Sequence, residues 1–78
     1  STNLWERYLI FNLKKCFMKS SGGLIFNLQV SSKSKIVKNI YYAGYDSFNK
    51  TLKQNFENVF YYSNESTPND GYFVLLRN

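Results

Sequence analysis

One alternating segment restricts the possible folds of this chain most strongly. Its apolar residues are separated by polar ones, in the order Phe26, Asn27, Leu28, Gln29 and Val30. A period of two residues is typical of a β-strand with one buried and one wetted face, which predicts a strand over residues 24–30. Helical patterns flank this strand on both sides, so the sequence predicts an α+β fold.

A first helix is predicted over residues 3–19. Asn3 and Glu6 have the spacing of a capping box, in which both side chains bind free amides of the first turn. The apolar residues spread beyond a single stripe: Leu4, Trp5, Tyr8, Leu9, Phe11, Leu13, Cys16 and Phe17. We therefore expect this helix to be covered on more than one side, or to offer part of its surface to a partner. Gly22 and Gly23 are expected to end it, because glycine tolerates the left-handed C-cap conformation.

Residues 35–42 allow two interpretations, and the choice between them decides the fold. With a period of two, Ile36 and Ile40 share a face, and the β-branched and aromatic content favours a strand. With a period of 3.6, the apolar residues form one helical face that Ser34 caps and Gly44 ends. The strand is the preferred interpretation.

A second helix is predicted over residues 46–56, with Asp46 as its N-cap. Its apolar residues recur at helical spacing: Phe48, Leu52, Phe56, Val59 and Phe60. The aromatic run at residues 60–62 could end this helix or begin a strand. Residues 63–71 contain Pro68 and are predicted to be a loop, and residues 72–76 the last strand. The predicted core is Trp5, Leu9, Leu13, Phe26, Leu28, Val30, Phe48, Leu52, Phe56, Phe73 and Leu75.

The composition argues against an enzyme. The chain has no histidine, and Cys16 is its single cysteine, so it lacks the residues for His-based catalysis and for a His- or Cys-ligated metal site. Its 5 acidic residues show no pairing suited to acid–base chemistry. We therefore expect no cofactor and no metal. The net charge of +5 is spread along the chain, and such a distribution suits phosphates, anionic lipid or plain solubility.

All 78 residues are expected to form one small domain, excised from a longer protein. If residues 35–42 are a strand, the fold is an α-β-β-α-β two-layer sandwich, with two helices on a three-stranded antiparallel sheet. Exposed edges of such a sheet can accept a strand from a partner, which makes the domain a protein-binding module.

Several segments resemble the periplasmic C-terminal domain of the TonB and TolA family. They are the opening helix with Tyr8-Leu9, the hairpin from Gly23–Val30 to Lys35–Ile40, and the segment Ala43–Asn49. The resemblance implies a periplasmic, cell-envelope energy-transducing module whose last strand pairs with partner segments. The implied partner-binding residues are Tyr72, Phe73, Val74, Leu75 and Leu76. Contact with a membrane is expected only through parts of the protein outside this chain.

The alternative fold is a cytoplasmic winged helix. If residues 34–43 are a helix, the helix at residues 46–56 becomes a recognition helix in the major groove of DNA. The residues that would contact bases and phosphates are Ser47, Asn49, Lys50, Lys53 and Gln54.

Overall fold

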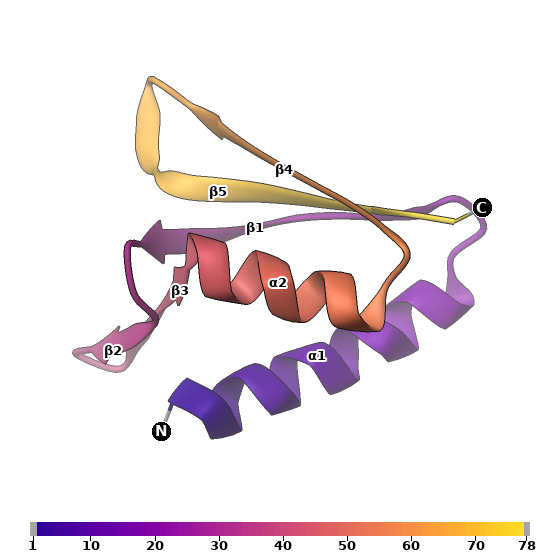
Figure 1. The fold of residues 1–78 in the computed structure, drawn as a ribbon, viewed down its shortest axis with the longest axis horizontal. Helices are drawn as coiled ribbons and strands as arrows, with labels where there is room; N and C mark the ends of the chain where they lie inside the picture. Colours follow the sequence, from indigo (N-terminus) through magenta and orange to yellow (C-terminus); the bar gives the residue numbers. More distant parts are fainter. Residues whose placement is uncertain (1, 78) are drawn as a thin grey trace.

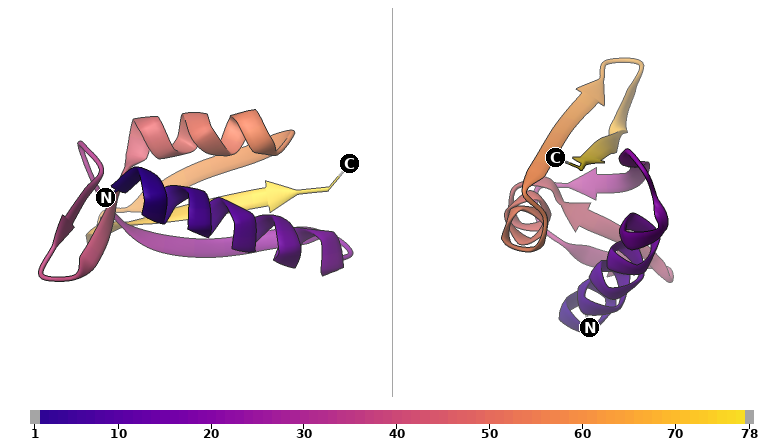
Figure 2. Two further views of the ribbon diagram at one scale, coloured as in Figure 1. Left: turned by 90° about the horizontal axis from the view of Figure 1, so that it is seen from below. Right: turned by 90° about the vertical axis from the view of Figure 1, so that its right-hand side faces the viewer.

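A computed structural model describes residues 2–77 (Figure 1). The elements are α1 (Thr2–Lys19), β1 (Gly23–Ser31), β2 (Lys35–Val37), β3 (Ile40–Gly44), α2 (Tyr45–Asn55), β4 (Asn58–Asn64) and β5 (Thr67–Leu76). The strands form one sheet in the order β2-β3-β1-β5-β4. Both helices lie on the same face of this sheet, which gives a two-layer α+β domain (Figure 2).

The predicted α+β class is confirmed, but the predicted three-stranded antiparallel sheet is wrong. The sheet has five strands and is mixed, because β1 pairs with β3 in parallel while the other neighbours are antiparallel. Two strands had been missed. Residues 35–42 contain two short strands in place of one. Residues 58–64 form β4, where the sequence allowed either a helix end or a strand start at residues 60–62 and predicted a loop over residues 63–71.

A two-residue turn at Lys38 and Asn39 divides the segment 35–42. Both residues have positive φ angles, 50° and 66°, and Val37 pairs with Ile40 across them. This is the geometry of the tight hairpin turns that suit the twist of antiparallel strands. A winged helix requires a helix at residues 34–43, so the alternative fold is wrong.

The ends of α1 differ from the capping prediction. Asn3 lies inside the helix, and the Glu6 side chain reaches across to other elements, as described below. At the other end, the Arg77 guanidinium donates hydrogen bonds to the carbonyl oxygens of Phe17, Met18 and Ser20, at 2.7, 3.0 and 2.8 Å. A cation at this position satisfies carbonyl groups that the helix leaves free.

Gly23 opens β1 and does not cap α1. Its φ of 141° is open to glycine but rarely to other residues, and a Cβ there would lie 2.0 Å from the carbonyl oxygen of Leu75. Glycine is therefore required where the start of β1 meets the end of β5.

α2 begins earlier than predicted. Gly44 is its N-cap and makes no side-chain capping bond, whereas Asp46 lies in the first turn, where its charge suits the helix dipole. Phe48, Leu52 and Phe56 point into the core, as the helical spacing predicted. Val59 and Phe60 belong to β4 instead of the helix.

The core lies between the helices and the sheet. Phe48, Leu52, Phe73 and Leu75 are completely buried. The buried hydrophobic residues of the described chain are Ile10, Leu13, Val30, Ala43, Phe48, Leu52, Phe56, Val59, Phe73 and Leu75. Of the predicted core, Leu9, Phe26 and Leu28 pack against this cluster while partly exposed. Trp5 is 42% exposed, so its assignment to the core is wrong.

The segment predicted as a loop is the end of a long hairpin. β4 and β5 are joined at Glu65 and Ser66, where the Asn64 side-chain oxygen accepts a hydrogen bond from the Ser66 amide at 3.0 Å. Pro68 lies at the start of β5, in the part of that strand that extends beyond its pairing with β1. This placement agrees with the rule that proline is tolerated where a strand lacks a neighbour on one side.

No helix among residues 2–77 is both long enough and apolar enough to span a bilayer.

Candidate functional site: an uncharged edge strand

β4 is an edge strand, because only β5 pairs with it in the sheet. Its seven residues, Asn58–Asn64, include no charged residue, no proline and no glycine. Natural proteins protect edge strands with lysine, proline, bulges or short length, since free main-chain groups there can pair with another chain. The only irregularity in the pairing of β4 lies at its very end, between Ser63 and Asn64. Most of this edge is therefore available for strand addition.

The opposite edge of the sheet is protected. β2 has three residues, begins with Lys35, and is followed at once by the tight turn at Lys38. The ammonium group of Lys35 lies over the ring of Tyr42, 5.4 Å from its centroid. A strand this short, with a lysine, offers little for a partner to pair with. The two edges are thus unequal, and β4 is the candidate.

The side chains of β4 alternate between the two faces of the sheet. Val59 is buried under α2, and the ring of Tyr61 packs on Phe73 with 4.9 Å between centroids. Partial burial raises the pKa of the Tyr61 hydroxyl above its usual value. These two residues fix β4 to the core. The edge is therefore held in place by side chains that do not face a partner.

Phe60 and Tyr62 alternate with Val59 and Tyr61, so they lie on the face of the sheet that no helix covers, which we call the open face. Phe60 and Tyr62 are 54% and 52% exposed there. The ring of Tyr62 stacks on that of Tyr72 in β5, with centroids 5.2 Å apart and planes at 11°. The register also places Val74 beside Phe60 and Ile25 beside Val74. An apolar and aromatic row thus runs across three strands and ends at the free edge.

The predicted partner-binding residues lie elsewhere than expected. β5 is an interior strand, paired with β1 on one side and β4 on the other, so the prediction that residues 72–76 form the pairing edge is wrong. Phe73 and Leu75 are completely buried in the core. Tyr72 and Val74 point to the open face, and Leu76 is 44% exposed. The β5 side chains that a partner beside β4 could reach are therefore those on the open face.

The residues of the alternative DNA-binding prediction all lie on α2. Ser47 donates a hydrogen bond to the carbonyl oxygen of Gly44 at 3.2 Å. Asn49 is half-buried, and its side-chain oxygen has no hydrogen-bond partner. Lys50, Lys53 and Gln54 are exposed on α2. No helix precedes α2 in the position that would support it in a major groove, since β3 leads directly into it.

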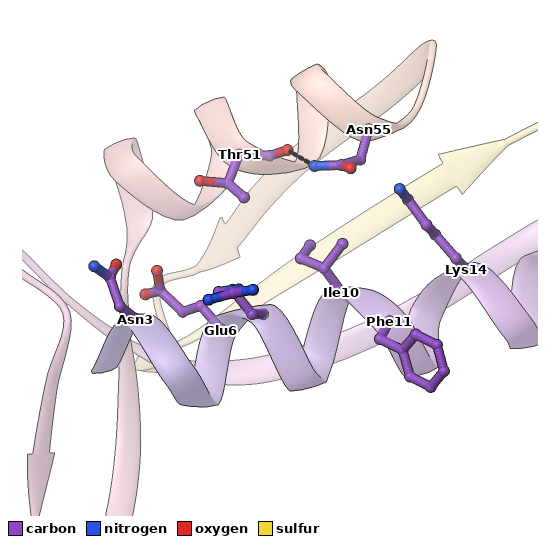
Figure 3. A pocket seen from close by; sticks show the side chains of 8 residues that line it. Asn3, Glu6, Ile10, Phe11, Lys14, Thr51 and Asn55 are labelled. Atoms are coloured by element: carbon purple, nitrogen blue, oxygen red, sulfur yellow. Dashed lines mark hydrogen bonds between the residues drawn. The ribbon is translucent and has the colours of Figure 1, made fainter. Parts of the chain in front are cut away.

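A shallow groove lies between α1 and α2 (Figure 3). Asn3, Glu6, Ile10, Phe11 and Lys14 line it from α1. Thr51 and Asn55 line it from α2, where the Asn55 amide donates to the Thr51 carbonyl oxygen at 2.8 Å. Within residues 2–77 there is no group of three His, Cys, Asp or Glu side chains that could hold a metal ion.

Glu6 has a structural role in this groove. Its carboxylate accepts hydrogen bonds from the hydroxyl groups of Ser34, at 2.6 Å, and of Tyr41. The hydroxyl oxygen of Ser34 in turn accepts a bond from the Gly44 amide at 2.9 Å. Through these two hydrogen bonds to its charged carboxylate, Glu6 links α1 to the β2–β3 region.

Comparison of the chain with protein-family models, with curated proteins and with solved structures gave no match.

The sequence analysis missed β4 as a functional element. A signal was present, because residues 58–64 carry no charge and contain four consecutive β-forming residues, Val59, Phe60, Tyr61 and Tyr62. Phe60 also fits the helical spacing of the preceding helix, so the sequence allowed either a helix end or a strand start at residues 60–62.

Proposed function

We propose that this chain is a non-enzymatic protein-interaction domain that binds an extended partner segment as an added strand beside β4. The observation that carries the proposal is the composition of β4, an edge strand of seven uncharged residues in a chain in which 19% of residues are charged. The outer main-chain groups of β4 would supply the hydrogen bonds, which gives affinity with little dependence on sequence.

Specificity would come from the open face. An added strand places every second side chain beside Phe60 and Tyr62, whose rings are about half exposed. Cross-strand pairs of aromatic and β-branched side chains are favourable. We therefore expect the partner segment to carry such residues at alternate positions. Residues 45–77, which include β4, hold three cations and four acids and are nearly neutral. We therefore expect no strong net charge on the partner segment.

This binding mode agrees with the one implied by the resemblance to the TonB and TolA family, but it uses a different strand. In the proposal the pairing strand is β4, since β5 has neighbours on both sides. A periplasmic location and a part in energy transduction in the cell envelope follow from the resemblance alone, and they remain predictions.

The test is a selection of random peptides displayed on phage, followed by NMR with the peptides obtained. We expect selected peptides to alternate in polarity. On titration, the amide shifts and the gain in protection from hydrogen exchange should concentrate on residues 58–64.

The variant Phe60→Lys places a charge on the binding edge and should weaken binding at least about tenfold, the effect expected of a central interface residue. The matched control is Val37→Lys, which adds the same charge to the opposite edge at a residue that is 43% exposed. Peptide binding that maps to another surface, or that survives Phe60→Lys with the fold intact, would exclude the proposal. Binding to a second copy in place of a peptide would appear as concentration-dependent dimers and would also exclude it.

A further inference from the structure

α1 has a second apolar face that points away from the sheet. Leu4, Tyr8, Phe11 and Met18 are 66%, 60%, 56% and 76% exposed. With Lys15 they follow the spacing i, i+4, i+7, i+11 and i+14, so they form one line along the whole helix. We call these five residues the outer stripe. The opposite side of α1, with Ile10 and Leu13, is buried against the core.

Other apolar side chains widen the outer stripe at the N-terminal end of α1. Trp5 is 42% exposed, and its ring lies 5.7 Å from that of Tyr8. Ile36 of β2, 45% exposed, joins Leu4, Trp5, Tyr8 and Phe11 around a shallow, largely apolar depression. α1 lies on the side of the domain away from β4 (Figure 1).

Cations flank the outer stripe on both sides. At 3.6 residues per turn, Arg7 and Lys14 lie along one border of the stripe and Lys19 along the other. The ammonium group of Lys15 lies over the ring of Phe11, 4.5 Å from its centroid. The single acid of α1, Glu6, faces Ser34 and Tyr41 instead.

The positive charge is concentrated in the first part of the sequence. Residues 2–44 contain seven cations and one acid, a net charge of +6. Residues 45–77 contain three cations and four acids, a net charge of −1. The excess positive charge thus lies in the part of the sequence that includes α1.

We propose that the outer stripe docks the domain onto an anionic lipid surface, with α1 lying in the plane of the interface. Leucine, methionine and aromatic side chains enter the boundary between headgroups and acyl chains, and flanking lysines keep their ammonium groups among the phosphates. Arg7, Lys14 and Lys19 are placed for this, and the domain's net charge of +5 attracts it to the surface before contact. A second copy is a poor occupant, because two domains of net positive charge repel each other. The surface is separate from β4, so this inference does not depend on the proposed function.

The experiment uses the single tryptophan as its probe. Trp5 borders the outer stripe, so docking should shift its fluorescence to shorter wavelength. The protein is mixed with vesicles of phosphatidylcholine and phosphatidylglycerol in equal parts, or with vesicles of phosphatidylcholine alone. We expect a blue shift and co-sedimentation with the anionic vesicles only, and a loss of both at high salt.

Two phenylalanines with nearly equal exposure provide matched variants. Phe11→Glu alters the outer stripe, and Phe60→Glu alters β4, at residues that are 56% and 54% exposed. Phe11→Glu should reduce partitioning to anionic vesicles at least about tenfold, from the lost burial of the ring and the added negative charge. The partitioning of Phe60→Glu should stay within about twofold of wild type, because this variant adds the same charge outside the outer stripe. Circular dichroism checks that both variants are folded.

Two results would overturn the inference. One is the absence of any difference between anionic and neutral vesicles for the folded wild type. The other is equal binding by Phe11→Glu and wild type, which would show that charge alone attracts the domain. Heparin and an acidic amphipathic peptide serve as further probes. A shift of Trp5 fluorescence with the peptide but with neither kind of vesicle would show that the outer stripe binds a protein helix. A shift with heparin but with neither kind of vesicle would show that it binds soluble polyanions. Either result would also overturn the inference.

Discussion

The hydroxyl group of Tyr41 in β3 donates a hydrogen bond to the carboxylate of Glu6 in α1, 35 residues earlier in the chain. Ser34 donates to the same carboxylate oxygen, so the first helix, the loop before β2 and the third strand meet at one acceptor. This contact holds the β2–β3 hairpin against α1. Glu6 thus lies on the side of α1 opposite the outer stripe, as the helical spacing requires.

Removing the Tyr41 hydroxyl should lower stability. Tyr41→Phe keeps the ring and its contact with Phe48 but deletes a bond to a charged acceptor in a half-buried position. Bonds of this type contribute about 1.5–3 kcal/mol when buried, so partial exposure suggests a loss of about 1–2 kcal/mol in the free energy of unfolding. Urea denaturation measures it. Tyr8→Phe is the control, because Tyr8 is 60% exposed, and it should change the free energy by less than about 0.5 kcal/mol. Equal effects of the two substitutions would contradict this role for Tyr41.

The same residue should make the domain sensitive to alkali. Burial, and then the hydrogen bond to Glu6 and its negative charge, raise the pKa of the Tyr41 hydroxyl far above its usual value. Above the unfolded pKa of about 10, the native state therefore holds a proton that the unfolded state releases, and stability falls as the pH rises. Thermal midpoints measured across the alkaline range should decline, and they should decline less steeply in Tyr41→Phe. An identical slope in the two proteins would contradict this origin of the alkaline sensitivity.

A charge at the centre of the α2 interface should unfold the domain. Leu52 has no exposed surface, and Leu52→Asp would bury an unpaired carboxylate at a cost of several kcal/mol, a large fraction of the stability of a small domain. Circular dichroism and thermal denaturation are sufficient to observe the loss. Lys53→Asp is the neighbouring control at an exposed position, and it should stay folded. An unchanged thermal midpoint for Leu52→Asp would mean that the buried face of α2 is wrongly assigned.

The sequence predicted the elements that have a clear period. Phe26, Leu28 and Val30 alternate because one face of β1 meets the helices, and Phe48, Leu52 and Phe56 recur because one side of α2 meets the sheet. In both elements the buried residues recur with the period of the secondary structure, so the sequence alone predicts which residues are buried.

The sequence did not predict elements that depend on pairing over long distances. β4 follows α2 after two residues, and the apolar residues of the two elements merge into one apparent helical series. The parallel pairing of β1 with β3 involves only Val30 with Ala43 and Ser31 with Gly44, and no local pattern encodes it. The candidate site was missed for the same reason, because which strand lies at an edge is a property of the whole sheet.

A substitution in the turn between β2 and β3 should stabilise the domain. Lys38 and Asn39 both have positive φ angles, a conformation that Asn followed by Gly adopts with less strain. The double variant Lys38→Asn with Asn39→Gly should therefore raise the free energy of unfolding by about 0.5–1 kcal/mol. Thermal denaturation against wild type measures the change. A loss of stability would indicate that the hairpin has a different turn.

Gly71 should resist substitution although it lies within a strand. A Cβ at this position would come within 2.6 Å of Cγ1 of Val30 and 2.7 Å of Cε1 of Tyr61. Because Gly71 has no side chain, the Tyr61 ring can pack closely over β5 there. Gly71→Ala should cost about 1–3 kcal/mol through overpacking, and it should also loosen β4, because Tyr61 helps to fix that strand. Gly22→Ala is the control, since nothing lies within 4 Å of a Cβ there. Hydrogen exchange of the β4 amides together with denaturation distinguishes the two effects. If Gly71→Ala leaves both the stability and the exchange of β4 unchanged, the close contact between Tyr61 and β5 is not part of what holds the binding edge in place.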